Sequence, residues 1–243
     1  MKLIEAVVFD MYGTLVENTS DLWMKTFDEI CVSQGLSIAG STLWDYWKPI
    51  EMQFRKDRLQ ADTNGRPTSF KTYREAWRNT FERSFEYFGG GDPDLASEKS
   101  ILDQGVRDLF PEARNVLQAL RGLSYLKIGL LSNADNDALI PLLNRHDLSF
   151  DAILTSETAQ SYKPTPEPFY CVAEMLGVSP EACIYVGDTQ LDDVLGGHNV
   201  GMKTAMLTRD NVTLDSSLPV PDYQLGDLND LLKIVNTCDE VNT

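Results

Sequence analysis

The chain has 243 residues, of which 42% are hydrophobic, and its 37 Asp and Glu residues against 21 Lys and Arg give a net charge of -16. This length accommodates one large domain or two smaller ones, and the apolar content excludes a disordered protein. A chain this acidic repels nucleic acid and anionic membrane surfaces, so we expect neither as a partner. Its apolar runs are also too short to predict a membrane span.

The cysteines and histidines argue against several kinds of site. The four cysteines are scattered and form no CxxC pair, which predicts neither a disulfide framework nor a thiolate metal site. His146 and His198 are far apart in the sequence, which argues against a histidine metal site or a Ser-His-Asp triad. Residues 1–9 contain an apolar run too short for a signal peptide. We therefore expect a protein of the reducing cytoplasm.

Short apolar runs alternate with segments of helical spacing along most of the chain. Strands are predicted over residues 3–9, 126–131, 152–154, 183–187 and 203–207. Helices are predicted over 111–121, 136–146 and 166–176, where apolar residues recur on one face. This alternation indicates an α/β fold, in which a parallel sheet is covered on both faces and presents its chemistry at the carboxyl ends of the strands.

Residues 17–105 interrupt this alternation with consecutive helical segments. These segments fall near 20–34, 41–61 and 68–88, and a turn at 89–94 precedes a further helix. The block contains all four tryptophans, Trp23, Trp44, Trp47 and Trp77. We expect an all-helical cap domain over 17–105, inserted into a core formed by 1–16 and 106–236. The remaining residues, 237–243, are expected to form a polar tail that frays.

Two polar segments come directly after predicted strands. In FDMYGTL (9–15), Asp10 ends the first strand beside a Gly-Thr turn, and a carboxylate placed there suits a nucleophile or a metal ligand. In LLSNAD (130–135), Ser132 and Asn133 leave a strand and open a helix. A hydroxyl, an amide and helical N–H groups together can bind an anion.

Two further segments add a cation and more carboxylates. In YKPTPEPF (162–169), Lys163 precedes a proline at a turn, where its ammonium can neutralise an anion. In VGDTQLDD (186–193), Asp188, Asp192 and Asp193 offer the oxygen ligands that Mg²⁺ prefers. Each segment alone is explained as an ordinary turn or helix cap. Four of them in this order point to one catalytic site.

The four segments resemble, in order, the four motifs of the haloacid dehalogenase superfamily. The resemblance extends from the first strand to position 210 or so, and it implies a Rossmann-like, doubly wound core with a helical cap inserted after the first motif. It also implies hydrolysis through a covalent aspartyl intermediate, with Asp10 as the nucleophile. Thr14, Ser132 and Lys163 would position the anionic group, and Asn133 would lie near the leaving group.

The same resemblance implies a Mg²⁺ ion. The Asp10 carboxylate, the Tyr12 backbone carbonyl and Asp188 would hold it, together with Asp192 or Asp193. We favour Asp193, because the residues that follow, DVLGGHNVGM (193–202), resemble the usual continuation in the family.

One position departs from the phosphatases of this family. They carry a second aspartate two residues after the nucleophile, which protonates the departing alcohol, and here Tyr12 stands at that position. A phenol with a pKa of about 10 is a poor acid at neutral pH, whereas a halide leaves without a proton. This first motif resembles that of the 2-haloacid dehalogenases, which bind the halide through a cap arginine. Asp45 aligns with that arginine, and Lys48 or Arg55 could serve instead.

The fourth motif favours the phosphatases, because Gly187–Asp188 is their metal-binding form and the dehalogenases usually lack it. We therefore predict a Mg²⁺-dependent phosphatase of a small anionic phosphorylated metabolite with an activated leaving group, such as an acyl or aryl phosphate. A 2-haloacid dehalogenase and a non-catalytic interaction protein on the same fold are the alternatives. The oligomeric state, monomer or homodimer, stays open.

Overall fold

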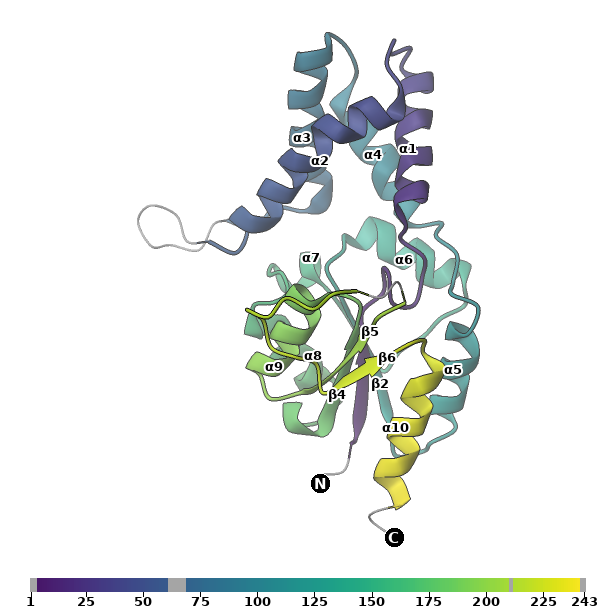
Figure 1. Cartoon of the computed structure of the whole chain (residues 1–243). Helices are drawn as coiled ribbons and strands as arrows, with labels where there is room; N and C mark the ends of the chain where they lie inside the picture. Colours follow the sequence, from purple (N-terminus) through teal and green to yellow (C-terminus); the bar gives the residue numbers. More distant parts are fainter. Residues whose placement is uncertain (1–3, 61–68, 210–211, 241–243) are drawn as a thin grey trace. The chain divides into compact units, whose positions relative to one another are not determined.

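The structure is a computed structural model that describes residues 4–60, 69–209 and 212–240. Within these ranges, six strands form one sheet in the order β3-β2-β1-β4-β5-β6, and each neighbouring pair is parallel (Figure 1). The strands are β1 (Ala6–Phe9), β2 (Lys127–Ser132), β3 (Ala152–Thr155), β4 (Cys183–Gly187), β5 (Lys203–Leu207) and β6 (Tyr223–Leu225). The predicted α/β class with a doubly wound parallel sheet is confirmed.

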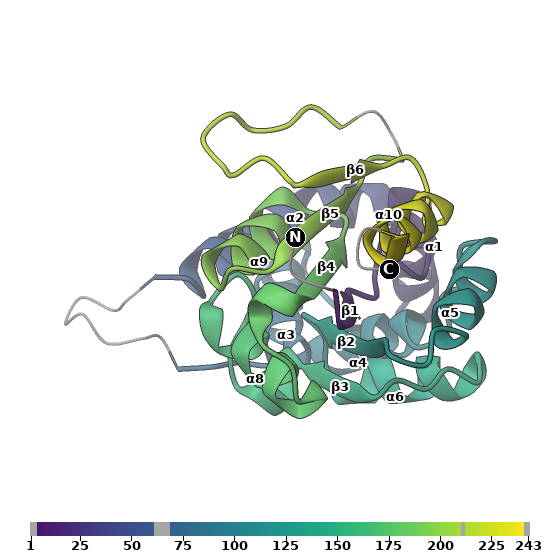
Figure 2. The ribbon, with the colours of Figure 1, turned by 90° about the horizontal axis from the view of Figure 1, so that it is seen from below.

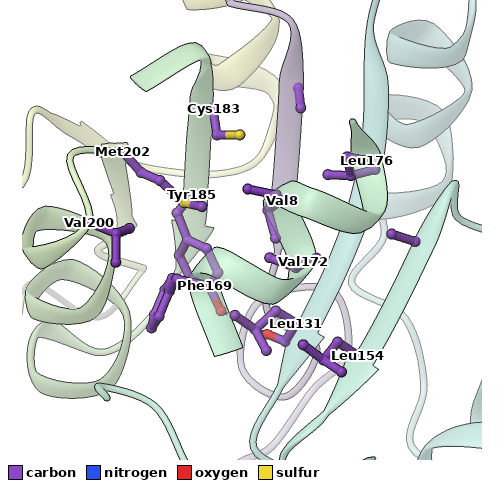
Figure 3. Close-up of a cluster of buried hydrophobic side chains, with 13 residues drawn as sticks. Val8, Leu131, Leu154, Phe169, Val172, Leu176, Cys183, Tyr185, Val200 and Met202 are labelled. Carbon is purple, nitrogen blue, oxygen red and sulfur yellow. Dashed lines mark hydrogen bonds between the residues drawn. The ribbon is translucent and has the colours of Figure 1, made fainter. Parts of the chain in front are cut away.

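Helices cover both faces of this sheet, which explains why its strands are continuous apolar runs. Figure 2 shows α8 (Pro166–Leu176) and α9 (Leu195–Asn199) on one face, and α5 (Ala113–Arg121) and α10 (Asn229–Glu240) on the other. Under α8 the core is a cluster of buried side chains in which Val8, Leu131 and Phe169 pack together (Figure 3). The sheet is therefore a rigid platform for the loops at its carboxyl edge.

The contacts divide the chain into two compact units. The first comprises Met1–Glu17, Asp108–Asn133 and Leu148–Thr243, and the second comprises Asn18–Arg107 and Ala134–Asp147. The expected limits, 17–105 for the cap and 106–236 for the core, remain a prediction. They assign 134–147 to the core, whereas the contacts of this segment lie with the inserted helices.

The second unit is entirely helical within the described residues. It contains α1 (Ser20–Ser33), α2 (Gly40–Asp57), α3 (Tyr73–Phe88), α4 (Pro93–Gln104) and α6 (Asn136–Arg145). The tryptophans form its aromatic core, with the Trp23 and Trp77 rings 5.3 Å apart. At the start of α6, the buried Asp135 carboxylate accepts hydrogen bonds from the N–H groups of Tyr73 and Arg74, and so caps the N-terminus of α3.

Several elements differ from the expectations in extent. Strand β6 was not predicted, because it is a three-residue strand without an apolar run. The segments expected at 41–61 and 68–88 correspond to α2 and α3, and positions 61 and 68 lie outside the described residues. Helix α10 reaches Glu240, so the expected tail at 237–243 begins within it, and 241–243 lie outside the described residues. Over the described ranges, no helix combines the length and hydropathy needed to cross a bilayer.

Candidate active site

Three neighbouring strands bring the predicted catalytic residues together. Asp10 follows β1, Ser132 ends β2 and Asp188 follows β4. Strand β1 lies between the other two, and all three run in the same direction. Their carboxyl ends therefore meet at one edge of the sheet, the usual position of a site in this architecture. Lys163 reaches the same place from the loop before α8.

The Lys163 ammonium lies at the centre of this site. Its side chain is only 2% exposed, and its Nζ lies 2.9 Å from Asp10 Oδ1 and 2.6 Å from Asp193 Oδ1. It donates a third hydrogen bond to the Tyr185 hydroxyl oxygen, at 2.7 Å. Three acceptors match the three N–H groups of an ammonium, so the orientation of Lys163 is fixed.

Asp193 accepts hydrogen bonds at both carboxylate oxygens. Its Oδ2 accepts from the Thr189 N–H at 2.9 Å, from Thr189 Oγ1 at 2.7 Å and from the Asp188 N–H at 3.2 Å. A Cβ at Gly187 would lie 2.3 Å from Asp193 Cγ. Glycine at 187 is therefore needed for Asp193 to reach into the site.

Asp10, Asp188 and Asp193 form the acidic cluster of the site. One carboxylate oxygen from each lies within 4.8 Å of the others. Gly13, with φ of +86°, allows the loop after β1 to approach this cluster, because a Cβ there would lie 2.3 Å from Asp188 Oδ2. Three carboxylate oxygens at such spacing suit a hard divalent cation.

Burial and mutual repulsion raise the pKa of two of these carboxyl groups. For Asp10, burial raises the pKa, the Lys163 charge lowers it and the Asp193 charge raises it further, so that the pKa lies above its usual value. For Asp188, burial and then the charges of Asp193 and Asp10 hold the pKa well above its usual range. Burial alone would lower the pKa of Lys163, but Asp10 and Asp193 hold it well above its usual value. The single ammonium of Lys163 neutralises only part of the negative charge of the three carboxylates. A bound cation would relieve the repulsion that remains between them.

Asn133 holds the backbone of Lys163. Its Oδ1 accepts from the Lys163 N–H at 2.9 Å, and its Nδ2 donates to the Lys163 carbonyl at 3.2 Å. The same Nδ2 lies 3.2 Å from Asp192 Oδ2, so the Asp192 carboxylate contacts Asn133. The expected position of Asn133 near the leaving group stays a prediction. The contacts show that it positions the loop that carries the lysine.

Thr14 lies in a tight loop and has a buried hydroxyl. Within the described part of the chain this hydroxyl has no hydrogen-bond partner, so it is available to a substrate oxygen. Arg209, two residues after β5, donates to the Thr14 carbonyl at 3.4 Å and pairs with Glu112 at 2.6 Å. Sequence reasoning missed Arg209 and Glu112, because no motif marks either residue and they meet only through the fold.

Comparison with known families identifies the chain. The sequence profile of the haloacid dehalogenase-like hydrolases matches residues 4–201. The chain belongs to this family. A phosphoglycolate phosphatase of Aquifex aeolicus is 33% identical over 240 residues, which cover 96% of this chain and 97% of that protein. The family resemblance drawn from the four motifs is confirmed, and the chain is a hydrolase.

Two solved structures share the fold of this haloacid dehalogenase-like hydrolase. The putative family member YfnB of Bacillus subtilis, bound to magnesium, has a TM-score of 0.77 at 20% identity, covering 97% of this chain and 100% of that one. An L-2-haloacid dehalogenase of Xanthobacter autotrophicus, with chloropropionic acid covalently bound, has a TM-score of 0.73 at 22% identity, covering 96% and 99%. At such identities the likeness supports the Rossmann-like fold and not the reaction.

The candidate halide-binding residues of the hydrolase lie on α2 and share one partner. Lys48 Nζ lies 2.8 Å from Oε2 of the buried Glu51, and Arg55 Nε pairs with the other oxygen of the same carboxylate. Glu51 therefore orients both cations. A role for Lys48 or Arg55 toward the leaving group stays a prediction.

Proposed function

We propose that this hydrolase is a Mg²⁺-dependent phosphatase of a small anionic phosphorylated metabolite. The observation that carries the proposal is the acidic cluster of Asp10, Asp188 and Asp193, whose oxygens lie within 4.8 Å of one another. Phosphoryl transfer concentrates negative charge that a cation and an ammonium can neutralise together. The phosphoglycolate phosphatase relative, at 33% identity, supports the same reaction class.

The residues present fit a divalent cation. Asp10, Asp188 and Asp193 would hold the ion through carboxylate oxygens, and Tyr12 would add its backbone carbonyl. Burial and repulsion raise the pKa of Asp10 and Asp188, a sign that the cluster lacks positive charge. When bound, Mg²⁺ would neutralise charge on the transferring phosphoryl group. Asp192 is the alternative to Asp193, and its contact with Asn133 favours Asp193 as the ligand.

The chain's own residues would carry out a two-step transfer. An Asp10 carboxylate oxygen attacks phosphorus in line, and the bond from phosphorus to the leaving oxygen breaks with its electron pair on that oxygen. Water then hydrolyses the aspartyl phosphate, which releases phosphate and restores the Asp10 carboxylate. Lys163 opposes the effect of burial on the pKa of Asp10 through their 2.9 Å contact and so favours the ionised nucleophile, and the hydroxyls of Thr14 and Ser132 would bind phosphoryl oxygens.

A screen of three substrates with and without Mg²⁺ tests this proposal. We expect chelator-sensitive phosphate release from an aryl phosphate, much slower release from phosphoglycolate, whose alkoxide leaving group is not activated, and no chloride release from L-2-chloropropionate. Asp10→Asn should abolish the activity, because it removes the nucleophile. Chloride release in the presence of chelator would instead establish a dehalogenase, and the absence of turnover on all three substrates would favour a non-catalytic role.

A 2-haloacid dehalogenase is the second candidate, and Tyr12 is the observation that favours it. Tyr12 lies in the loop after β1, where its backbone pairs with Val16, at the position of the family's general acid. A carbon–halide bond is broken without protonation of the leaving group, so Tyr12 would cost that reaction nothing. For the phosphatase, Tyr12 restricts the substrate to activated leaving groups, such as acyl or aryl phosphates.

The expected setting follows from charge and cysteine chemistry. We propose a cytoplasmic enzyme with a small anionic substrate and with neither nucleic acid nor membrane as a partner. Cys31, Cys171 and Cys183 are free thiols, in keeping with a reducing compartment.

A further inference from the structure

Tyr185 is a buried phenol on β4, in the core cluster under α8. Its side chain is 1% exposed and its ring lies 5.0 Å from that of Phe169. Figure 3 shows its hydroxyl directed toward Leu131, among carbon atoms of the cluster. A hydroxyl so deeply buried is costly unless it is hydrogen-bonded, so its partners are informative.

Those partners define where each proton lies. The Tyr185 hydroxyl donates to the Leu131 carbonyl at 2.8 Å, and this uses its only hydrogen. The phenol oxygen therefore accepts the hydrogen bond that the Lys163 ammonium donates, at 2.7 Å. The lysine Nζ lies 5.2 Å from the centre of the Tyr185 ring, beyond the hydroxyl and close to the line of the C–O bond, so the phenol contacts the cation through its oxygen.

We propose that Tyr185 is a positioning residue for Lys163. By accepting one N–H on the side of the apolar core, it directs the other two toward Asp10 Oδ1 and Asp193 Oδ1, at 2.9 and 2.6 Å. Without the phenol oxygen, the third N–H would face apolar side chains, and the ammonium would rotate away from the nucleophile to find another acceptor. The inference rests on the role of Lys163 in the proposed function.

The first test observes the lysine itself and needs no substrate. In ¹H–¹⁵N correlation spectra of lysine-labelled protein, a buried ammonium with three acceptors should give a persistent, slowly exchanging signal, identified by its loss in Lys163→Met. We expect Tyr185→Phe to speed the exchange of this signal about tenfold or more, since one charged hydrogen bond is lost. Val172→Ala is the matched control, because Val172 is buried in the same cluster and leaves the phenol in place.

The second test is kinetic. On an aryl phosphate with Mg²⁺, Tyr185→Phe should lower kcat about 10- to 100-fold and leave KM within about threefold, the range for a hydrogen bond to a charged group. Val172→Ala, which loses packing alone, should keep kcat.

The outcomes separate failure of this inference from failure of the proposed function. A Tyr185→Phe variant with the exchange rate and kcat of the control overturns the inference. If Tyr185→Phe does not fold, the wild-type spectrum tests the inference in its place. The absence of a persistent Lys163 signal from that spectrum would also overturn the inference. A wild-type protein that shows the signal but has no phosphatase activity contradicts only the proposed function.

Discussion

Tyr12 stands two residues after the nucleophile, in a loop whose path is fixed. Gly13 has a φ of +86° and approaches Asp188 too closely for any Cβ. The backbone at 12 is thus held in place whatever side chain it carries, and the substituent there sets only the chemistry. A substitution at position 12 should therefore change the chemistry of the side chain without moving the loop, which makes this position suitable for testing the leaving-group requirement.

We predict that Tyr12→Asp raises turnover of alkyl phosphates such as phosphoglycolate by about 10²-fold or more, because an acid then protonates the departing alkoxide. Turnover of an aryl phosphate, whose leaving group needs less protonation, should change far less. Phosphate release from both substrates measures the effect, and Tyr12→Phe, which adds no acid, is the control. Equal wild-type turnover of alkyl and aryl phosphates would refute the requirement.

At the scale of elements, strand ends were predictable and side-chain partnerships were not. Asp10, Ser132 and Lys163 stand beside recognisable motifs at strand ends or turns, so their meeting could be inferred from parallel strands alone. Asp192 and Asp193 are adjacent. The residues that follow favour Asp193, and the π-helical turn η2 (Gln190–Val194) is the structural feature that directs Asp193 toward Lys163. In the sequence, nothing distinguishes Tyr185 from the other buried residues of an apolar strand. Its contact with Lys163 depends on the loop before α8 meeting β4, which no local pattern encodes.

Helix α2 provides the one prediction that follows from a pKa. Burial alone would raise the pKa of Glu51, but Arg55 and Lys48 outweigh it, so the pKa lies below the ordinary 4.5. A carboxyl group with a lowered folded-state pKa stabilises the fold above its unfolded pKa, and this contribution is lost as the pH falls through the folded value. The ion pairs of α2 should therefore weaken in acid.

We predict that Glu51→Gln lowers the free energy of unfolding at neutral pH by about 1–3 kcal/mol, because it leaves two cations without their buried partner. The difference from wild type should shrink as the pH falls from 4.5 through the lower folded-state pKa, because the wild-type carboxyl then becomes neutral in both states. Urea unfolding across this pH range measures both effects. Glu82→Gln removes one of the two carboxylate partners of Arg78, the other being Asp94, and should cost less than about 1 kcal/mol. A Glu51→Gln difference independent of pH would contradict the assignment.

At the scale of the whole molecule, the net charge of -16 and the acidic cluster are connected. Three carboxylates, with oxygens within 4.8 Å of one another, concentrate negative charge at the sheet edge. The remaining acidic residues add to the repulsion between like charges in the folded protein. A bound divalent cation would offset part of both, so its effect should appear in the stability of the protein as well as in its activity. The four tryptophans all lie in the second unit, so far-UV circular dichroism is the better probe of the unit that holds the site.

We predict that Mg²⁺ raises the Tm of the wild-type protein. At one hundred times its Kd, an ion that binds only the folded state stabilises by about 2.7 kcal/mol, and each kcal/mol is worth roughly 2–4 °C for a chain of this size. Asp188→Asn should lose the shift, because it removes a ligand of the cluster. Asp192→Asn, one residue from Asp193 but with its carboxylate against Asn133, should keep it. Loss of the shift in Asp192→Asn but not in Asp188→Asn would reassign the cation to the other aspartate and move it away from the nucleophile.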